Sequence, residues 1–323
     1  MWLSRVRDDG RGSFITGHGL PDLGPMSRIH RTPRPLPWPG FVTAWRAAFG
    51  LSLLLVAAGL AVTLASSSEA YIVLATTTST RDSGLLDYLL PEFSRDSGIG
   101  VRYVAVGTGQ ALDVARRGDA DIVMVHAPAI ELDFMAQGHG LCRSRVMRNE
   151  FIVVGPASDP AGIRGLTNAT AAFARILSSR ALFVSRADNS GTHIMERTIW
   201  GWVNYTPDPD VDSWYREAGS GMAATLEVSS QLGGYTLSDN GTFLVRRSSL
   251  DLEVDVQNDP PLQNLYSVIP VNPALHPNVK SSWALGFARW LVSPRGQGLI
   301  GNYTAGGEQP FHPEAQDGCG HVG

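Results

Sequence analysis

The segment Tyr71-Ile-Val-Leu-Ala-Thr-Thr-Thr-Ser-Thr80 is the clearest indication of the fold class of this chain. Its first five residues are continuously apolar, which is typical of a strand buried on both faces within a parallel sheet. Five hydroxyl-bearing residues follow, and the leucines between Leu85 and Phe93 then recur at helical spacing. A buried strand, a polar turn and a helix form the repeating unit of an α/β sheet.

The same unit recurs immediately downstream. Residues 101–106 read as a second strand, Gly107-Thr-Gly109 as a turn, and residues 110–117 as a helix. Residues 120–125 read as a third strand. This alternation predicts an α/β fold whose parallel strands are joined by right-handed crossovers.

At 323 residues the chain lies near the upper limit for a single hydrophobic core, so we expect two lobes. The apolar strand at 151–156 is followed by the turn signal Asp159-Pro160, where the chain can enter a second lobe. Residues 265–271 read as the strand that returns. We therefore assign residues 71–155 and 266–323 to lobe 1 and residues 156–265 to lobe 2, each a mostly parallel sheet flanked by helices.

The first 70 residues read as an export segment with a disordered leader. Residues 47–68 carry no charge and follow a basic flank, as in a secretory signal. Cleavage before Tyr71 and retention of residues 47–68 as a membrane anchor are both open. Either outcome leaves Tyr71 onward outside the cytoplasm, so we expect a secreted or extracytoplasmic protein.

Cysteine and sequon positions fit that location. The two cysteines, Cys142 and Cys319, are expected to form one disulfide in an oxidising compartment, and two unpaired thiols are the alternative. Candidate N-glycosylation sites are Asn168, Asn204, Asn240 and Asn302.

Charge and motifs exclude several classes of function. Residues 71–323 contain 19 basic and 26 acidic residues, a net charge of −7, which argues against nucleic acid or an anionic membrane as partner. His126 and His193 lack a partner at metal-ligand spacing, so we predict no metal site. No nucleophile elbow or P-loop is present, so we assign no catalytic residues and expect a protein that is not an enzyme.

Three predicted strand-to-helix turns are rich in hydroxyls and glycine, namely residues 76–80, 107–109 and 185–192. In α/β sheets ligands bind beyond the carboxyl ends of strands, where helix N-termini offer free N–H groups. Hydroxyls, glycine amides and one arginine, Arg186, can together hold a small oxyanion. Each turn alone is better explained as ordinary helix capping, but the three together favour an anion site.

Several strings, taken in order, resemble the tungstate-binding proteins of ABC importers. The resemblance runs from about Tyr71 to about Pro313. The strings that carry it are Leu74-Ala-Thr-Thr-Thr-Ser-Thr-Arg-Asp-Ser-Gly-Leu-Leu86, Val106-Gly-Thr-Gly-Gln-Ala-Leu112, Gly118-Asp-Ala-Asp121, Phe183-Val-Ser-Arg-Ala-Asp-Asn-Ser-Gly-Thr-His193 and Tyr235-Thr-Leu-Ser-Asp-Asn-Gly-Thr242.

This resemblance implies a type II periplasmic-binding-protein fold with an oxyanion, tungstate first, in the cleft between the lobes. It implies no cofactor, a monomer, and an ABC importer membrane subunit as the partner. Phosphate, sulfate or molybdate is the alternative ligand, and a secreted sensor or interaction protein without a transport role is the alternative function. The anion contacts carried over by position are Thr77, Thr78, Ser79, Thr108, Arg186, Ser190 and Thr192.

Ala187 and the segment 239–242 also bear on the predicted anion site. Ala187 stands where the family string has glycine, a minor departure on the expectation that the backbone keeps a negative φ there. Asp239-Asn-Gly-Thr242 reads as an ordinary turn, with Tyr235 and Thr236 supporting the site from behind.

Overall fold

The computed structural model describes residues 70–322. The predicted export segment, including the possible anchor at 47–68, lies outside the described residues. Within the described residues no helix is long and apolar enough to span a bilayer. The strands are β1 (Tyr71–Thr77), β2 (Gly100–Val106), β3 (Ile122–Val125), β4 (Ser144–Gly155), β5 (Phe183–Ser185), β6 (Tyr215–Glu217), β7 (Thr236–Asp239), β8 (Glu253–Val256), β9 (Gln263–Pro270) and β10 (His312–Gln316).

Helices alternate with these strands, as the sequence predicts. They are α2 (Thr78–Asp82), α3 (Leu85–Ser97), α4 (Thr108–Arg116), α5 (Pro128–Ala136), α6 (Ala169–Ser179), α7 (Gly191–Trp202), α8 (Met222–Leu232), α9 (Asn240–Arg246), α10 (Ser281–Val292) and α11 (Pro294–Asn302), with short 3-10 turns η1 (Arg247–Ser249) and η2 (Pro260–Leu262).

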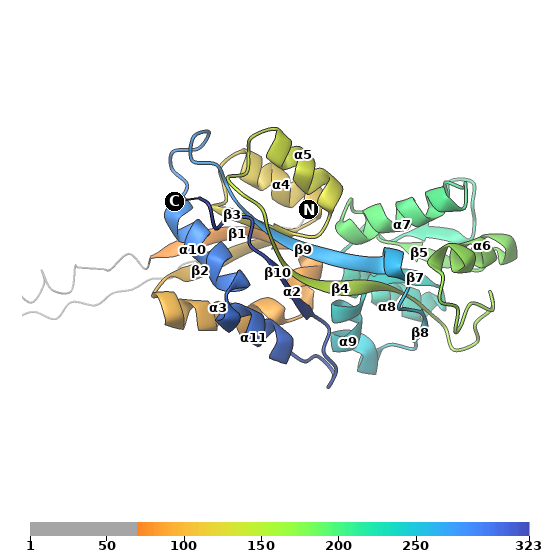
Figure 1. Ribbon diagram of the computed structural model, residues 1–323. Coiled ribbons are helices and arrows are strands. Elements are labelled where there is room, and N and C mark those ends of the chain that lie inside the picture. Colours follow the sequence, from red (N-terminus) through yellow and green to blue (C-terminus); the bar gives the residue numbers. More distant parts are fainter. Residues whose placement is uncertain (1–69, 323) are drawn as a thin grey trace, which may run out of the picture. The chain divides into compact units, whose positions relative to one another are not determined.

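The elements form two groups, which we call lobe 1 and lobe 2 (Figure 1). Lobe 1 contains β1, β2, β3 and β10 with α2–α5, α10 and α11, and lobe 2 contains β5–β8 with α6–α9. Strands β4 and β9 run between the groups. The α/β fold class is thus confirmed, and the described residues show two strands as the connection between the lobes.

Strand β4 belongs to both lobes. Its first half, residues 144–150, pairs with β9, and residues 145–148 also pair with β10. Its second half pairs with β7 from Phe151 to Val154 and with β8 from Val153 to Gly155. The pairing therefore changes lobe between Glu150 and Phe151, a few residues before the boundary that the sequence suggested.

The sheet of lobe 1 is mixed, which corrects the expectation of mostly parallel sheets. Its strand order is β10-β4-β9-β3-β1-β2, and only β2, β1 and β3 are parallel to one another. Strands β9, β4 and β10 each run antiparallel to their neighbours. In lobe 2, β5 and β6 are parallel, whereas β7 and β8 are antiparallel to β4. The antiparallel part arises because β4 leaves lobe 1 and β9 returns to it in the opposite direction.

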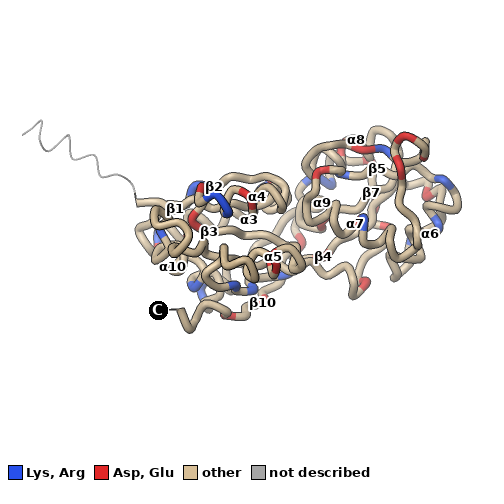
Figure 2. Tube along the Cα trace, turned by 90° about the horizontal axis from the view of Figure 1, so that it is seen from above, with Lys and Arg blue, Asp and Glu red and all other residues tan. Residues whose placement is uncertain are grey.

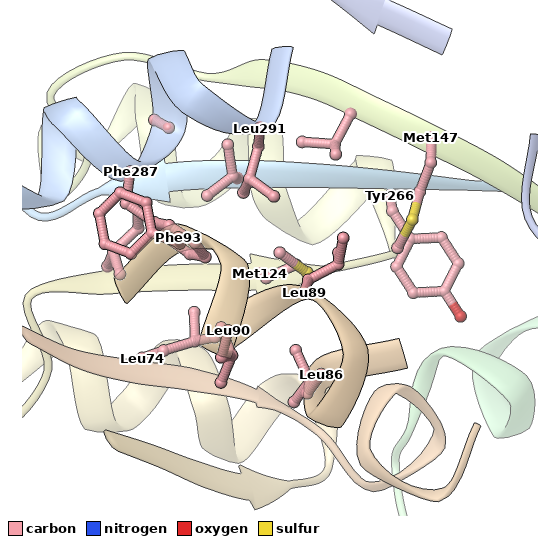
Figure 3. Close-up of a cluster of buried hydrophobic side chains, with 14 of the residues drawn as sticks. Leu74, Leu86, Leu89, Leu90, Phe93, Met124, Met147, Tyr266, Phe287 and Leu291 are labelled. Atoms are coloured by element: carbon pink, nitrogen blue, oxygen red, sulfur yellow. The ribbon is translucent and has the colours of Figure 1, made fainter. Parts of the chain in front are cut away.

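Both faces of the lobe 1 sheet are covered by helices. On one face Leu86, Leu89 and Phe93 of α3 pack with Phe287 and Leu291 of α10 (Figure 3). On the other face Leu112 of α4 and Phe134 of α5 cover Val123 and Val125 of β3. The unbroken apolar strands follow from this arrangement, because alternate residues of one strand face different helices.

The disulfide Cys142–Cys319 ties the C-terminal tail to the start of β4. The two Cα atoms are 5.2 Å apart and both side chains are buried. The bridge closes a loop with a sequence separation of 177 residues, so it restricts the unfolded chain strongly.

Candidate functional site

The three hydroxyl-rich turns each connect a strand to a helix, as predicted. They join β1 to α2, β2 to α4, and β5 to α7. The first-turn amides of these helices have no carbonyl four residues earlier to bond within the helix, which is why helix N-termini attract anions. A fourth such turn, Asp239 at the end of β7, begins α9.

Arg186, at the end of β5, joins two of these turns. Its side chain is almost fully buried, at 1% exposure. One terminal nitrogen, Nη1, donates to Ser79 Oγ at 2.9 Å and to Thr192 Oγ1 at 3.3 Å, while Nη2 donates to Thr78 Oγ1 at 3.1 Å. Ser79 and Thr78 belong to lobe 1, so this one arginine links the two lobes.

The three hydroxyls around Arg186 are thereby oriented. Each oxygen accepts a hydrogen bond from an N–H of the guanidinium, so its own hydrogen must point away from the arginine. Thr78, Ser79 and Thr192 therefore present hydroxyl donors beside a buried positive charge. Fixed donors around a buried cation suit an anion with oxygen on every side.

The charge of Arg186 is partly balanced by Asp188. Arg186 Nη2 lies 2.5 Å from Asp188 Oδ2, and Asp188 Oδ1 accepts from the backbone N–H of Ser190 at 3.1 Å. Arg186 Nε is buried and, within residues 70–322, has no hydrogen-bond partner. The guanidinium therefore keeps donor capacity that the protein does not use.

The other predicted contacts serve the turns themselves. Thr77 caps α2, and its hydroxyl accepts from Thr80 N at 3.2 Å. Ser190 caps α7 by accepting from His193 N at 3.3 Å. Thr108 Oγ1 accepts from the N–H of Gly191 at 3.1 Å, which joins the second turn to the third. These hydroxyls lie close to the Arg186 cluster, but each accepts a hydrogen bond from a backbone N–H group.

The backbone at Ala187 is left-handed, which corrects the expectation of a negative φ. Ala187 has φ 51° and Asn189 has φ 55°. Asparagine tolerates this region, whereas alanine is strained there by its Cβ. Glycine would relieve that strain, so the departure at Ala187 stores strain beside Arg186.

The Asp239–Thr242 segment is not the ordinary turn that the sequence suggested. Asn240 and Gly241 are the first residues of α9, and Asp239 caps this helix by accepting from Thr242 N at 2.9 Å. Burial raises the pKa of Asp239. The Asp cap offsets the turn preference of Asn-Gly.

Tyr235 and Thr236 do not support the Arg186 cluster directly. Tyr235 Oη donates to Asp159 Oδ1 at 2.6 Å, and Thr236 Oγ1 donates to the carbonyl of Val184 at 2.7 Å. Thr236 thus holds β5 just before Arg186, whereas Tyr235 binds the segment after β4.

Glu196 is a buried support of the third turn that sequence reasoning missed. It lies on α7 and accepts from Ser185 Oγ at 2.8 Å and from Tyr215 Oη at 2.8 Å. Burial raises its pKa to about 7, opposed by these hydrogen bonds. The Ser185 hydroxyl also accepts from Ala187 N at 3.2 Å, so Glu196 anchors both residues that flank Arg186.

His126 is a buried hydrogen-bonding group that joins distant segments of the chain. Its Nε2 lies 3.2 Å from Thr77 Oγ1 and its Nδ1 lies 2.9 Å from Asn264 Oδ1. Burial lowers its pKa to about 4, and the nearby charge of Arg186 acts in the same direction. The side chain is therefore neutral near pH 7.

A cavity lies beside this cluster rather than at it. A hollow of about 500 Å³ is lined by residues of α7 and the following loop, among them His193, Arg197 and Thr206. It shares no residue with the Arg186, Ser79 and Thr192 cluster. Within residues 70–322 no group of three His, Cys, Asp or Glu side chains could hold a metal ion.

The candidate glycosylation sites lie in different surroundings. Asn168 and Asn302 are exposed, and Asn168 caps α6 with its side chain. Asn204 has φ 54°, and Asn240 is partly buried at the start of α9.

Acidic and basic residues are interspersed along both lobes, without a continuous basic stretch in the described residues (Figure 2).

The chain is similar in sequence to a known protein family and to several of its members. The model of the PBP superfamily domain matches residues 63–295. The tungstate-binding protein TupA of Peptoclostridium acidaminophilum is 45% identical over 240 residues, covering 74% of this chain and 83% of that protein. TupA of Campylobacter jejuni is 35% identical over 229 residues, covering 70% and 84%.

A solved structure gives the same result. The tungstate-binding protein TupA from Desulfovibrio alaskensis is 44% identical, with a TM-score of 0.67, covering 76% of this chain and all of that one. Sequence identity and fold therefore point to the same relatives. The chain belongs to the PBP superfamily and, within it, to the family of the TupA tungstate-binding proteins.

Proposed function

We propose that this chain is an extracytoplasmic solute-binding protein that captures tungstate between its two lobes. The observation that carries the proposal is the Arg186 cluster, in which one buried guanidinium orients Thr78, Ser79 and Thr192 as hydroxyl donors. Membership of the TupA family supports tungstate as the anion.

The chemistry favours an anion that carries no proton. Tungstate, molybdate and sulfate are fully deprotonated near neutral pH, whereas phosphate keeps a proton that needs an acceptor. The nearest carboxylate, Asp188, is engaged by Arg186 through one oxygen and by Ser190 N through the other. Phosphate is therefore the weaker candidate.

The remaining parts of the proposal follow from the family. The chain acts as a monomer, without a cofactor and without catalysing a reaction, and it delivers the anion to the membrane subunit of an ABC importer. The four sequons are glycosylated where the host cell has the machinery. These statements rest on the relatives and on the sequence.

Calorimetric titration with tungstate, molybdate, sulfate and phosphate tests the proposal. Tungstate should bind most tightly and phosphate most weakly. Absence of heat with all four anions, in a sample whose circular dichroism shows a folded protein, would remove the oxyanion-binding function.

A further inference from the structure

A chain of buried polar side chains runs from the first anion turn to both strands that connect the lobes. It starts at Thr77, passes through His126, and continues to Asn264 on β9 and Asn149 on β4. All four side chains are at most 3% exposed. The chain therefore joins the turn to the connecting strands in a site that water does not reach.

Hydrogen-bond directions along this chain fix the state of His126. Asn264 Nδ2 donates to Asn149 Oδ1 at 2.7 Å, so the other end of the Asn264 amide, Oδ1, is the acceptor for His126. His126 must then carry its hydrogen on Nδ1. A neutral imidazole with Nδ1–H has an acceptor at Nε2, 3.2 Å from Thr77 Oγ1; with Thr80 Oγ1 donating to Thr77 at 2.8 Å, the Thr77 hydroxyl donates to His126.

The surroundings leave His126 little freedom. Its ring stacks on Tyr266, with the centroids 4.6 Å apart and 23° between the planes. On the other side is Gly191, the first residue of α7, where an added Cβ would lie 2.7 Å from the ring. His126 therefore contacts lobe 1, lobe 2 and a connecting strand at once.

Among residues 70–322, the charged groups that shift the pKa of the ring both belong to the third turn. Arg186 lowers the pKa of His126 and Asp188 raises it, while the other neighbours, Asn264, Thr77 and Tyr266, are uncharged near pH 7. Both charges belong to the anion cluster. The ring therefore lies between the cluster and the connecting strands.

We propose that His126, as the neutral Nδ1–H tautomer, is the positioning residue that fixes the Thr77 turn to the connecting strands. This inference rests on the proposed function, because the turn so fixed carries Thr78 and Ser79. The Thr77 hydroxyl donates to His126 and so is not a donor to the anion. Thr77 acts through the geometry of the turn.

Nitrogen NMR of the full chain, with histidine labelled by ¹⁵N, tests the tautomer first. At pH 7 the His126 signal, assigned by its loss in His126→Asn, should show a protonated Nδ1 and an unprotonated Nε2. Thr77→Val should shift the Nε2 resonance, because the donor is removed. An Nε2–H tautomer, or an unchanged resonance in Thr77→Val, would overturn the proposal.

Tungstate titrations of matched variants test the positioning role. Asparagine at 126 can place an amide N–H where Nδ1–H was, so His126→Asn keeps the bond to Asn264 and loses the acceptor for Thr77. We expect His126→Asn and Thr77→Val each to weaken binding about tenfold, and the double variant to be no weaker than either. Thr77→Ser should bind like the unchanged protein.

Two results separate this inference from the proposed function. If the unchanged protein binds no tungstate, the proposed function fails, and the tautomer measurement still decides the state of His126. If the unchanged protein binds and the two single variants add fully in the double variant, the coupling between Thr77 and His126 is contradicted. Should His126→Asn fail to fold, Thr77→Val and Thr77→Ser still test the link.

Discussion

The first and third turns contribute to the candidate site in different ways. The first turn, Thr76–Thr80, supplies hydroxyls on a regular helix start and is held from behind by His126. The third turn, Ser185–Thr192, supplies the charge of Arg186 on a left-handed backbone and is held by Glu196. The first turn thus contributes hydroxyl donors alone, whereas the third contributes the charge together with the Thr192 hydroxyl, and each turn has its own buried support.

Removing the charge of Arg186 should have the largest effect on tungstate binding. Arg186→Ala should weaken tungstate binding by at least about a hundredfold, because a buried charged hydrogen-bond donor is lost and three hydroxyls lose their orientation. Arg216→Ala, which changes an exposed arginine on β6, is the matched control and should bind normally. Equal affinity in the two variants, measured by calorimetry, would remove Arg186 from the site.

Lowering the pH should remove the stability that neutral His126 contributes at the first turn. Burial lowers the pKa of His126 from 6.5 to about 4, so the unfolded chain binds a proton between these values that the folded chain does not. Stability contributed by the neutral ring is present above pH 6.5 and is lost as the pH falls towards 4. The loss is about 3 kcal/mol.

Urea unfolding of the unchanged protein and of His126→Asn, at several pH values between 4 and 7, measures this loss. The stability difference between the two proteins should shrink as the pH falls. The opposing contribution of Glu196, whose raised pKa destabilises the fold as the pH rises, is common to both proteins and cancels. A difference independent of pH would show that His126 titrates normally.

Hydroxyls oriented by Arg186 should differ from hydroxyls that only cap helices. Ser79→Ala removes a predicted donor and should weaken tungstate binding about tenfold with little change in stability. Ser190→Ala removes the cap of α7 and should lower the free energy of unfolding by about 1 kcal/mol, with a smaller loss of affinity. Calorimetry and urea unfolding on both variants compare the two classes, and the reverse pattern would contradict the assignment.

The smallest effect is expected at the strained residue of the third turn. Ala187→Gly should raise the free energy of unfolding by roughly 0.5–1 kcal/mol, because glycine adopts φ 51° without strain. Ala127→Gly, at a buried alanine with negative φ, should instead destabilise the protein. Thermal unfolding would detect either an increase or a decrease in stability.

Local patterns in the sequence predicted the elements whose signals are local. The apolar run of β1 and the leucine spacing of α3 specify a strand and a helix without reference to distant residues. Strand β4 was recognised only from Phe151 onward, because residues 144–150 are mostly polar and find their partners in β9 and β10. Pairing between distant segments leaves little trace in one sequence.

The residues of the candidate site, like the elements of the fold, were predicted where their signal was local. Hydroxyl-rich turns and one arginine pointed to Thr78, Ser79, Thr192 and Arg186, which the structure brings together. The link from His126 to Asn264 spans 138 residues and could not be read from spacing. The left-handed φ of Ala187 was also missed, since alanine gives no local sign of that conformation.

A crystal structure of the tungstate complex, with anomalous scattering from tungsten, would locate the bound anion. We expect one strong peak within hydrogen-bond reach of Ser79, Thr78 and Thr192 and beside Arg186. A peak in the 500 Å³ cavity beside α7, with none at the Arg186 cluster, would contradict this expectation.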